Sequence, residues 1–396
     1  MRVLLMNHFP LTGSGSGVYT LNIARALVRK GHEVCIIFPE NEAIDLDDLA
    51  PIKLHPVYFD NCAAGALNFD FPCFTTHPRS VTTFFELTDA QISSYEQAFR
   101  TALDKEMREF KPDIIHCGHI WLQASYAADY KIPLIITAHG TDLIGYRKST
   151  RFRTAARRAF DAAFRIIAIS NDNQDLVGEL FEDNAKCQLI RNGYDPEIIY
   201  PEDTSVREVL DIFDIQHDYD TIISFAAKFA YFKGIDILLQ GAKLYDREGV
   251  ATIVAGDGEL FEEMTALKNS LSLDNVYFVH NQTHEVLRKL YNSAKLSLLT
   301  SRNEPFGLVA IEALACGTPV IASNEGGPLD IITPQVGLLF ESENPADLAN
   351  KVRLLLDDEV LFDREYVASY AREKYSQDNS INLLIDVYTE ALKSLD

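Results

Sequence analysis

Short apolar runs alternate with longer segments of helical periodicity along almost the whole chain. In the first half, the runs that predict buried strands are residues 3–6, 34–38, 113–117, 134–138, 165–169 and 187–190. In the second half, they are residues 221–226, 252–255, 276–280, 296–300, 320–322 and 337–340. The segments between them have the spacing of amphipathic helices. This alternation predicts the α/β class, with parallel sheets built from βαβ units.

A polar stretch broken by proline, Tyr200–Asp203, separates the two series and has the composition of a linker. We therefore predict an N-terminal Rossmann-like domain over residues 1–200 and a second one over residues 201–375. The length of 396 residues and the 47% content of hydrophobic residues fit two globular cores. The last helical segment, residues 376–396, follows the second domain.

Composition limits the classes of partner. The formal net charge of −22 argues against a nucleic acid, because phosphate contacts need clustered Lys and Arg. The six cysteines show no C-x-x-C or other metal-binding spacing, so we expect reduced thiols, no metal site and a cytoplasmic location. We expect no signal peptide, and no apolar run reaches the roughly 18–20 residues of a membrane span. These features are compatible with contact at a membrane surface, and no sequence feature indicates an oligomeric state.

One charged residue stands in an otherwise apolar helical segment, residues 306–316. That residue is Glu312, and a lone carboxylate in a buried helix is unfavourable unless it is hydrogen-bonded. Glu304 precedes it by eight positions, in a turn that Pro305 and Gly307 mark. Two interpretations are open. Either Glu304 is an exposed turn residue and Glu312 pairs with an Arg or Tyr of the core, or both carboxylates bind a ligand.

The start of this helix is a natural anion site, because its first N–H groups have no partner within the helix. The residues there are Phe306, Gly307, Leu308 and Val309. A carboxylate on each side of an anion site suits a ligand with phosphates in the middle and hydroxyl groups at both ends. We therefore predict that this region binds a nucleotide sugar.

A glycine-rich loop follows the first strand, with glycines at positions 13, 15 and 17. This spacing is not G-x-G-x-x-G, and no G-K-[ST] is present, which argues against dinucleotide-binding and P-loop proteins. The loop is either a flexible surface loop or a place where the backbone at Gly15 and Gly17 approaches the donor diphosphate or an acceptor. We favour the second interpretation, because open α/β sheets bind ligands at the carboxyl ends of their strands.

Further polar residues and glycines follow predicted strands. Lys228 and Lys233 are positioned to neutralise a departing diphosphate. A single His at a strand end, such as His139, is a packing residue about as often as a ligand contact, and His116 and His119 are expected to pack. The candidate site residues in such positions are His139, Thr141, Asp142, Lys228, Lys233, Gly256 and Asn281.

A basic run stands out against the acidic background, with Arg or Lys at positions 147, 148, 151, 153, 157 and 158. As a helix, it would place Arg151 and Arg158 on one face. The run could be a solvated face paired with acidic neighbours, a site for an acceptor phosphate or carboxylate, or a patch for anionic lipid. The apolar face is weak for a membrane helix, so we favour a small anionic or polar acceptor at Arg151 and Arg158.

The sequence from Glu304 to Ser323, EPFGLVAIEALACGTPVIAS, resembles the E-x7-E motif of the retaining glycosyltransferases of family GT4. The H-G-T-D at 139–142, the N-G-x-D at 192–195, the Lys-Gly at 233–234 and the G-D-G at 256–258 are similar to motifs of the same family. The resemblance is weakest over 40–90 and 200–220. Lys228 departs from the pattern, because Arg is commoner there and Lys lacks the bidentate fork.

The resemblance implies the glycosyltransferase B architecture, in which two Rossmann-like domains face each other across a cleft and the last helix, here 376–396, crosses back to the first domain. It implies a retaining enzyme that moves a hexose or N-acetylhexosamine from a nucleoside-diphosphate sugar, most often a UDP-sugar, to a hydroxyl of a small polar acceptor. No cofactor and no metal ion are implied.

The resemblance also implies roles for single residues. Glu304 and His139 contact the donor hexose, and Glu312 holds the ribose. The N–H groups around Leu308 and Val309 touch the phosphates. The strand end before Asn281 borders the nucleotide base. Independently of the resemblance, we place acceptor contacts at the residues Thr141, Asp142, Arg151 and Arg158.

Three other classes remain. A sugar-nucleotide epimerase would act on the donor alone, and a phosphorylase would use inorganic phosphate. A non-catalytic subunit would bind the nucleotide sugar without turnover. A glycosyltransferase with a lipid acceptor at the membrane surface is a further alternative.

Overall fold

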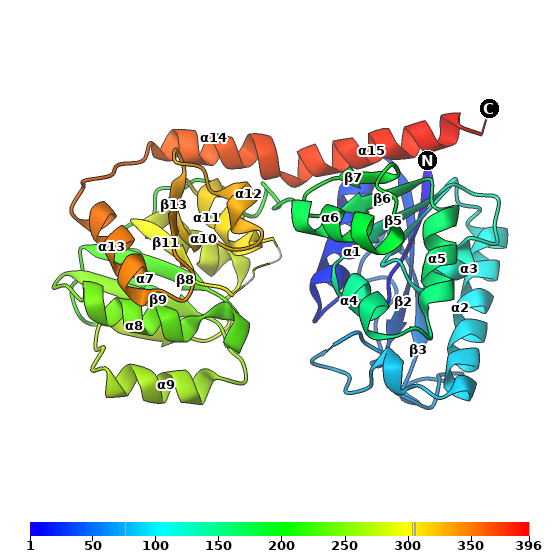
Figure 1. Ribbon diagram of the computed structural model, residues 1–396, viewed down its shortest axis with the longest axis horizontal. Helices are drawn as coiled ribbons and strands as arrows, with labels where there is room; N and C mark the ends of the chain where they lie inside the picture. Colours follow the sequence, from blue (N-terminus) through cyan, green and yellow to red (C-terminus); the bar gives the residue numbers. More distant parts are fainter. Residues whose placement is uncertain (76, 303, 305, 396) are drawn as a thin grey trace. The chain divides into compact units, whose positions relative to one another are not determined.

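A computed structural model describes residues 1–75, 77–302, 304 and 306–395. The chain forms two α/β units (Figure 1). Unit 1 consists of Met1–Arg191 and the chain from Ser380 onward, and unit 2 is Asn192–Asn379. The first unit thus ends before the predicted boundary at residue 200. The reason is Tyr194, which is buried in the core of unit 2 and exchanges backbone hydrogen bonds with Tyr375 (3.0 Å) and Gln377 (2.8 Å).

Unit 1 contains a seven-stranded parallel sheet of order β3-β2-β1-β4-β5-β6-β7. Its strands are β1 (Arg2–Met6), β2 (Glu33–Glu40), β3 (Lys53–Tyr58), β4 (Ile114–Gly118), β5 (Leu134–Ala138), β6 (Arg165–Ala168) and β7 (Cys187–Leu189). Its helices are α1 (Gly15–Arg29), the 3-10 helix η1 (Phe84–Glu86), α2 (Asp89–Glu109), α3 (Leu122–Ala127), α4 (Thr141–Lys148), α5 (Arg153–Ala162), α6 (Asn171–Phe181) and α15 (Gln377–Lys393).

Two apolar clusters cover the faces of this sheet. Helices α1 and α15 pack on one face, and α2, α3, α5 and α6 pack on the other. The C-terminal helix α15 lies along unit 1 in Figure 1. It buries its apolar side in that core through Ile381, Leu384, Val387, Tyr388 and Ala391.

The segment between β2 and α2 is more ordered than its composition indicates. It contains the edge strand β3, which the sequence analysis missed because Pro56 interrupts its pattern, and proline is tolerated only on such edges. The aromatic residues that follow are buried in the core of unit 1. They are Phe59, Phe69, Phe71, Phe74 and Phe84.

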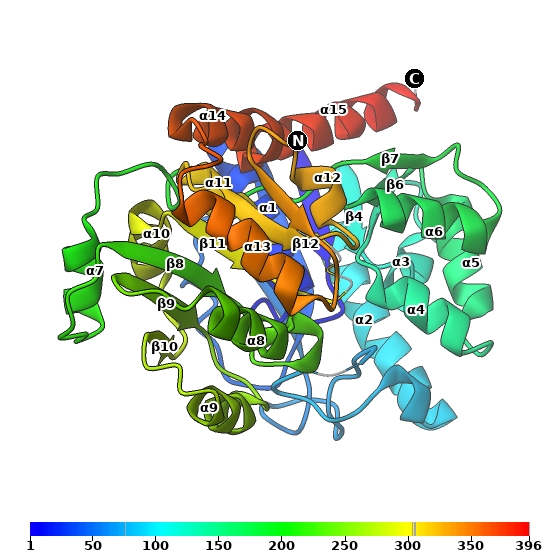
Figure 2. The same ribbon diagram turned by 60° about the vertical axis from the view of Figure 1, so that its left-hand side comes forward.

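Unit 2 contains a six-stranded parallel sheet of order β10-β9-β8-β11-β12-β13. Its strands are β8 (Thr221–Ala226), β9 (Val250–Ala255), β10 (Val276–Val279), β11 (Leu296–Leu299), β12 (Val320–Ser323) and β13 (Gly337–Phe340). Its helices are α7 (Val206–Ile212), η2 (Tyr231–Lys233), α8 (Ile235–Tyr245), α9 (Phe261–Ser270), α10 (His284–Ser293), α11 (Leu308–Ala315), α12 (Pro328–Ile331), α13 (Pro345–Leu356) and α14 (Arg364–Tyr375). Helices α8 and α13 lie side by side on one face of this sheet (Figure 2).

Both sheets share one feature that positions a site. The first strand of each unit lies in the middle, between the second and the fourth, so the direction of strand succession reverses there. Open α/β sheets bind ligands outside the carboxyl ends of the strands at this switch point. We therefore expect ligand-binding residues in the loops after β1 and β4 in unit 1, and after β8 and β11 in unit 2.

Candidate active site

The switch point of unit 2 brings a lysine and a carboxylate together. The Nζ of Lys233 donates to Oε2 of Glu304 across 2.6 Å, and the two side chains are only 18% and 10% exposed. The residues are 71 positions apart in sequence, and they meet because β8 and β11 are hydrogen-bonded neighbours. A cation and a carboxylate thus occupy the edge where this fold binds its ligands.

Lys228 lies in the same loop but has a different partner. Its Nζ lies 3.1 Å from Oε2 of Glu259, and the two side chains are 55% and 58% exposed. An exposed ion pair holds its side chains weakly. Of the two predicted lysines, only Lys233 is paired with Glu304 in this structure, while Lys228 is free to turn toward a ligand.

The backbone next to Lys233 is fixed to the end of β11. Gly234 has a φ of +64°, and a Cβ there would lie 2.0 Å from the carbonyl oxygen of Thr300. The Thr300 hydroxyl donates to the Gly234 carbonyl across 2.8 Å. Only glycine allows this approach, which sets the starting point of the Lys233 side chain.

Arg302 was missed by the sequence analysis, although it lies two residues before Glu304. Its guanidinium donates to both carboxylate oxygens of Asp236 (2.9 and 2.8 Å), to the Tyr231 carbonyl (2.7 Å) and to Glu343. The hydrogen bonds to Asp236 raise the pKa of Arg302 above its usual value. This residue ties the Lys233 loop to the segment that carries Glu304. A basic residue beside a motif carboxylate is the signal that could have found it.

Replacing Arg302 with lysine is expected to lower the free energy of unfolding by about 2 kcal/mol, because the charge stays but the bidentate fork to Asp236 is lost. With the loop less fixed, kcat should fall roughly tenfold. Urea unfolding and steady-state kinetics measure both effects. The matched control is Arg247→Lys, since Arg247 bonds Asp357 across 2.6 Å on the surface. Equal effects of the two substitutions would show that Arg302 is an ordinary surface residue.

The helix after Glu304 is shorter than predicted. It begins at Leu308 instead of residue 306, because Gly307 has a φ of +91°, outside the range of a right-handed helix. Phe306 packs in the core of unit 2, and Leu308 and Val309 supply the first-turn N–H groups, which a helix leaves unpaired. Pro305 lies outside the described residues. The helix thus begins two residues later than predicted, and the anion site at its start stays a prediction.

Glu312 is buried in α11, with 7% of its surface exposed. The Tyr291 hydroxyl donates a hydrogen bond to Glu312 Oε2 across 3.5 Å. Burial outweighs this bond and raises the pKa of Glu312 to about 7. The predicted alternative of a core Tyr partner is thus present, but the bond is long. A carboxylate left so weakly satisfied is suited to accept hydrogen bonds from a ligand.

This pKa gives stability a defined dependence on pH. An unfolded Glu has a pKa of about 4.3, so the folded state binds the Glu312 proton more tightly and loses stability as pH rises from about 4.3 to 7. The total is about 4 kcal/mol. Glu312→Gln should therefore be more stable than the parent at pH 8 and similar to it at pH 4. Urea unfolding across this range measures it, with exposed Glu359→Gln as the control. A difference that does not change with pH would contradict the assignment.

The predicted residues Gly256 and Asn281 lie in neighbouring loops joined by a carboxylate. Gly256 has a φ of +144°, and a Cβ there would lie 1.9 Å from the Ala227 carbonyl oxygen. Asp257 accepts from the backbone N–H of Asn281 (2.8 Å) and bonds His280 (2.6 Å), which lowers the pKa of Asp257. Asp257 therefore holds the loop after β10 in place, a role that its position in the G-D-G turn indicates.

In unit 1, the glycine loop has two kinds of glycine. A Cβ on Gly17 would lie 2.1 Å from the carbonyl oxygen of Pro10, so this glycine lets α1 pack against its own loop. A Cβ on Gly15 would meet no atom within 4 Å. Ser14 caps α1 by accepting from the Gly17 N–H across 3.1 Å. Packing thus explains Gly17, while the exposed Gly15 has room above it for a ligand.

His139 follows β5, and Asp142 fixes its backbone. Asp142 is fully buried and accepts from the N–H groups of His139 (3.1 Å) and Ile120 (2.8 Å), while burial raises its pKa to about 6. Its carboxylate is occupied, which gives it a supporting role and not the acceptor contact that the sequence analysis assigned. Thr141 is the first residue of α4 and partly exposed, so it remains available to a ligand.

Two further histidines lie beside His139. The ring centroid of His119 is 4.7 Å from that of His139 and 5.4 Å from that of His8. Burial lowers the pKa of His8 and His139 to about 3, so both are neutral at physiological pH. His8 and His119 follow β1 and β4, at the switch point of this sheet. The sequence analysis did not include His8 among the candidate site residues, although its position directly after a predicted strand could have indicated it.

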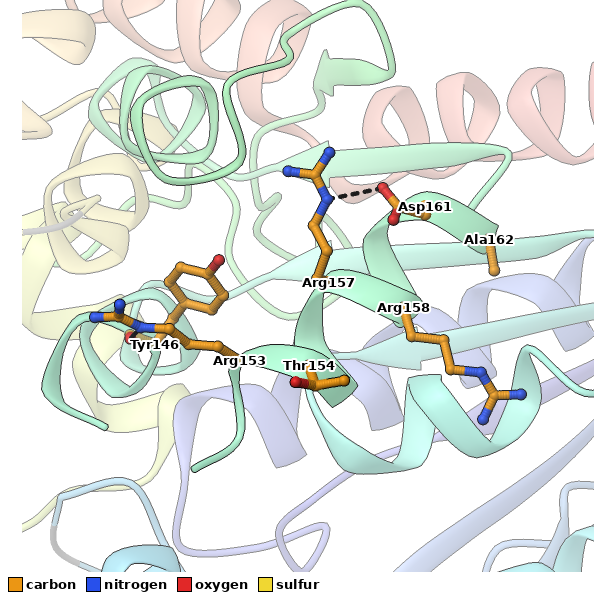
Figure 3. Close-up of a pocket in the computed structure, with 7 residues that line it drawn as sticks. All are labelled: Tyr146, Arg153, Thr154, Arg157, Arg158, Asp161 and Ala162. Atoms are coloured by element: carbon orange, nitrogen blue, oxygen red, sulfur yellow. Dashed lines mark hydrogen bonds and ion pairs between the residues drawn. The ribbon is translucent and has the colours of Figure 1, made fainter. Parts of the chain in front are cut away.

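The basic run is not one helix. It is divided between α4 and α5 by a turn, so Arg151 does not share a helical face with Arg158. Arg151 pairs with Asp89, Arg158 with Asp129, and Arg157 with Asp161. Figure 3 shows the last pair on α5, beside a surface hollow of about 780 Å³. The alternative of a solvated face paired with acidic neighbours therefore describes these arginines better than a preformed acceptor site.

Among the described residues, no group of three or more His, Cys, Asp or Glu side chains could hold a metal ion. None of the helices over the same residues has both the length and the apolar character that a membrane crossing requires.

Two family profiles match consecutive parts of the chain. The profile described as Glycosyltransferase Family 4 matches residues 13–198, and the one described as Glycosyl transferases group 1 matches residues 211–374. An uncharacterized glycosyltransferase of Methanocaldococcus jannaschii is 26% identical over 98% of this chain and 97% of its own length. The D-inositol 3-phosphate glycosyltransferase of Geodermatophilus obscurus is 27% identical over 96% of this chain and 86% of its own length.

The fold is also similar to that of solved glycosyltransferase structures. Anabaena HepE, determined in complex with UDP and glucose, aligns with a TM-score of 0.71 and 18% identity over 100% of both chains. At this level of identity, the likeness establishes the fold alone.

Proposed function

Because this chain belongs to glycosyltransferase family 4 and has the glycosyltransferase B fold, we propose that it is a retaining enzyme that transfers a hexose or an N-acetylhexosamine from a UDP-sugar to a hydroxyl of a small polar acceptor. In this reaction the bond between the sugar C1 and the diphosphate oxygen breaks. The acceptor oxygen bonds to C1 and loses its proton, and UDP leaves.

The observation that carries the proposal is the pair of Lys233 and Glu304 at the switch point of unit 2. A diphosphate that develops charge as it leaves needs a cation and N–H dipoles near it. Lys233 supplies the cation, and the N–H groups of Leu308 and Val309 supply the dipoles. On donor binding, Lys233 turns from Glu304 to the phosphates, and Glu304 becomes free to accept from hydroxyls of the hexose.

The remaining roles follow the sequence motifs. Glu312 accepts from the ribose hydroxyls, for which its long bond to Tyr291 leaves it available. His139, neutral because of its burial, contacts the donor hexose. Lys228 joins the diphosphate contacts, since its surface ion pair with Glu259 breaks readily.

Two relatives support the substrate classes. HepE was solved with UDP and glucose, which favours UDP as the nucleotide. The similarity to a D-inositol 3-phosphate glycosyltransferase favours a polyol with an anionic group as the acceptor. We further propose that the reaction needs no metal ion, with Lys233 in the place of a divalent cation. Activity that survives EDTA would support this, and activity that depends on added Mg²⁺ would refute it.

Thermal shift measurements test the donor site. The protein is heated with UDP, GDP or ADP, then with their sugars and with NAD, and bound ligand raises Tm by mass action. UDP and UDP-sugars should raise Tm, and Glu312→Ala should lose most of that shift. As a control, Glu359→Ala should keep it, because Glu359 is an exposed glutamate elsewhere in unit 2.

The same ligands separate the alternative activities. A transferase releases UDP only when an acceptor is present, an epimerase converts the donor alone, and a phosphorylase requires inorganic phosphate. If no nucleotide raises Tm, or if Glu312→Ala responds as the parent does, the donor site is misplaced and the proposal fails.

A further inference from the structure

A chain of hydrogen bonds runs through unit 1 from the C-terminal helix toward His139. The Tyr388 hydroxyl on α15 lies 2.6 Å from Nδ1 of His116 on β4. The other ring nitrogen, Nε2, lies 2.8 Å from Oγ1 of Thr137 on β5. The Tyr19 hydroxyl on α1 lies 3.5 Å from the same Thr137 oxygen. Four elements far apart in sequence thus contribute to one polar group in the core.

This group lies against His139. Thr137 lies on β5 (Leu134–Ala138), two residues before His139, which follows the strand. The Tyr19 ring meets the His139 ring edge to face at 5.0 Å. A cavity of only about 10 Å³ remains among Tyr19, His116, Thr137 and His139, so the side chains are almost close-packed. Nε2 of His139 has no hydrogen-bond partner among the described residues, and packing therefore sets the position of this ring.

The direction of the hydrogen bonds follows from burial. Tyr388 is fully buried, and His116 Nδ1 is the acceptor available to its O–H, so the O–H donates there. Burial keeps His116 neutral, so its single ring proton is on Nε2 and is donated to Thr137. The Thr137 hydrogen is then left to point at the Tyr19 oxygen. The Tyr388 hydroxyl thereby sets the tautomer of His116 and the orientation of every group after it.

We infer that Tyr388 is a positioning residue for sugar transfer, which acts on His139 through His116, Thr137 and Tyr19. The inference rests on the proposed role of His139 in the reaction. It gives the C-terminal helix a function beyond covering the sheet: its tyrosine fixes the ring that contacts the donor hexose.

The test is Tyr388→Phe, which removes one oxygen and keeps the ring. We expect kcat to fall roughly fivefold with KM for the donor unchanged, because a misplaced contact group slows the reacting step. In a His139→Ala background, Tyr388→Phe should have no further effect on kcat, since both changes act through one group. Ser380 also lies on α15, and its Oγ donates to the Arg191 carbonyl across 2.8 Å. The matched control, Ser380→Ala, removes this hydrogen bond. It should leave kcat unchanged.

A second readout needs no activity. The ¹⁵N spectrum of the histidine rings, assigned with His116→Gln and His139→Gln, should show His116 protonated at Nε2 in the parent. In Tyr388→Phe, the spectrum should show a mixture of tautomers and a shifted His139 ring. An unchanged spectrum, or equal losses of kcat in both backgrounds, would overturn the inference. If no nucleotide sugar is used as a donor, the proposed function fails, and the spectrum still decides whether Tyr388 controls the His139 ring.

Discussion

Replacing Lys233 with alanine is expected to lower kcat by roughly 10²–10³-fold, the loss typical when one group that stabilises developing charge is removed from an active site. The structure gives the physical reason. Lys233 is the cation at the switch point of unit 2, largely buried and 2.6 Å from Glu304. Its removal takes away the proposed partner of the leaving diphosphate and leaves the Glu304 carboxylate buried without a counter-charge.

The size of this effect is measured by steady-state kinetics with the nucleotide sugar that the thermal shift assay identifies. The matched control is Lys295→Ala, because Lys295 also bonds a carboxylate, that of Asp358, across 2.6 Å on the surface of unit 2. The control should retain kcat within about twofold, as expected for a surface ion pair. If both variants lose activity equally, or if neither does, Lys233 has no part in the transfer.

Replacing Gly234 with alanine is expected to destabilise unit 2 by about 4 kcal/mol and to abolish most activity. The left-handed backbone at a φ of +64° contributes about 1–2 kcal/mol. The remainder comes from the new Cβ, which would lie 2.0 Å from the Thr300 carbonyl oxygen, where the backbone must shift to make room. That shift displaces Lys233, the adjacent residue.

A second glycine separates the two contributions. Gly249 has a φ of +78°, but a Cβ there would come no closer than 3.4 Å to Oδ2 of Asp220. Gly249→Ala should therefore show the backbone term alone, about 1–2 kcal/mol, with activity retained. Urea unfolding of both variants measures the difference. Equal losses of stability would mean that the loop after β8 adjusts freely and does not hold Lys233 in place.

Most strands of the two sheets could be predicted from the sequence, because a strand of a parallel sheet is buried on both faces and forms a continuous apolar run. The exception is β3, an edge strand with Lys53, His55 and Pro56, whose composition is typical of a loop. The start of α11 was also predicted wrongly, since Gly307 leaves the helical range there without changing the apolar pattern.

The basic run shows a different limit of sequence reasoning. Its charges are clear, but the acidic residues that neutralise them are Asp89, Asp129 and Asp161, two of which lie more than twenty positions away. A charge pattern does not reveal such partners, because ion pairs form between side chains that the fold brings together. The same reason applies to Asp142, whose burial between two loops removes it from the list of acceptor contacts.

The sequence by itself determined the α/β class, the division into two series of strands and helices, and the segment around Glu304 and Glu312. These features depend on residues that are neighbours along the chain, because periodicity, turn residues and helix ends are local properties of the sequence. Only the tertiary structure decided which lysine pairs with Glu304 and that Arg302 fixes the loop that carries Lys233. It also decided how far burial raises the pKa of Glu312. Each of these depends on distance and solvent access between residues far apart in sequence, and packing alone sets both quantities.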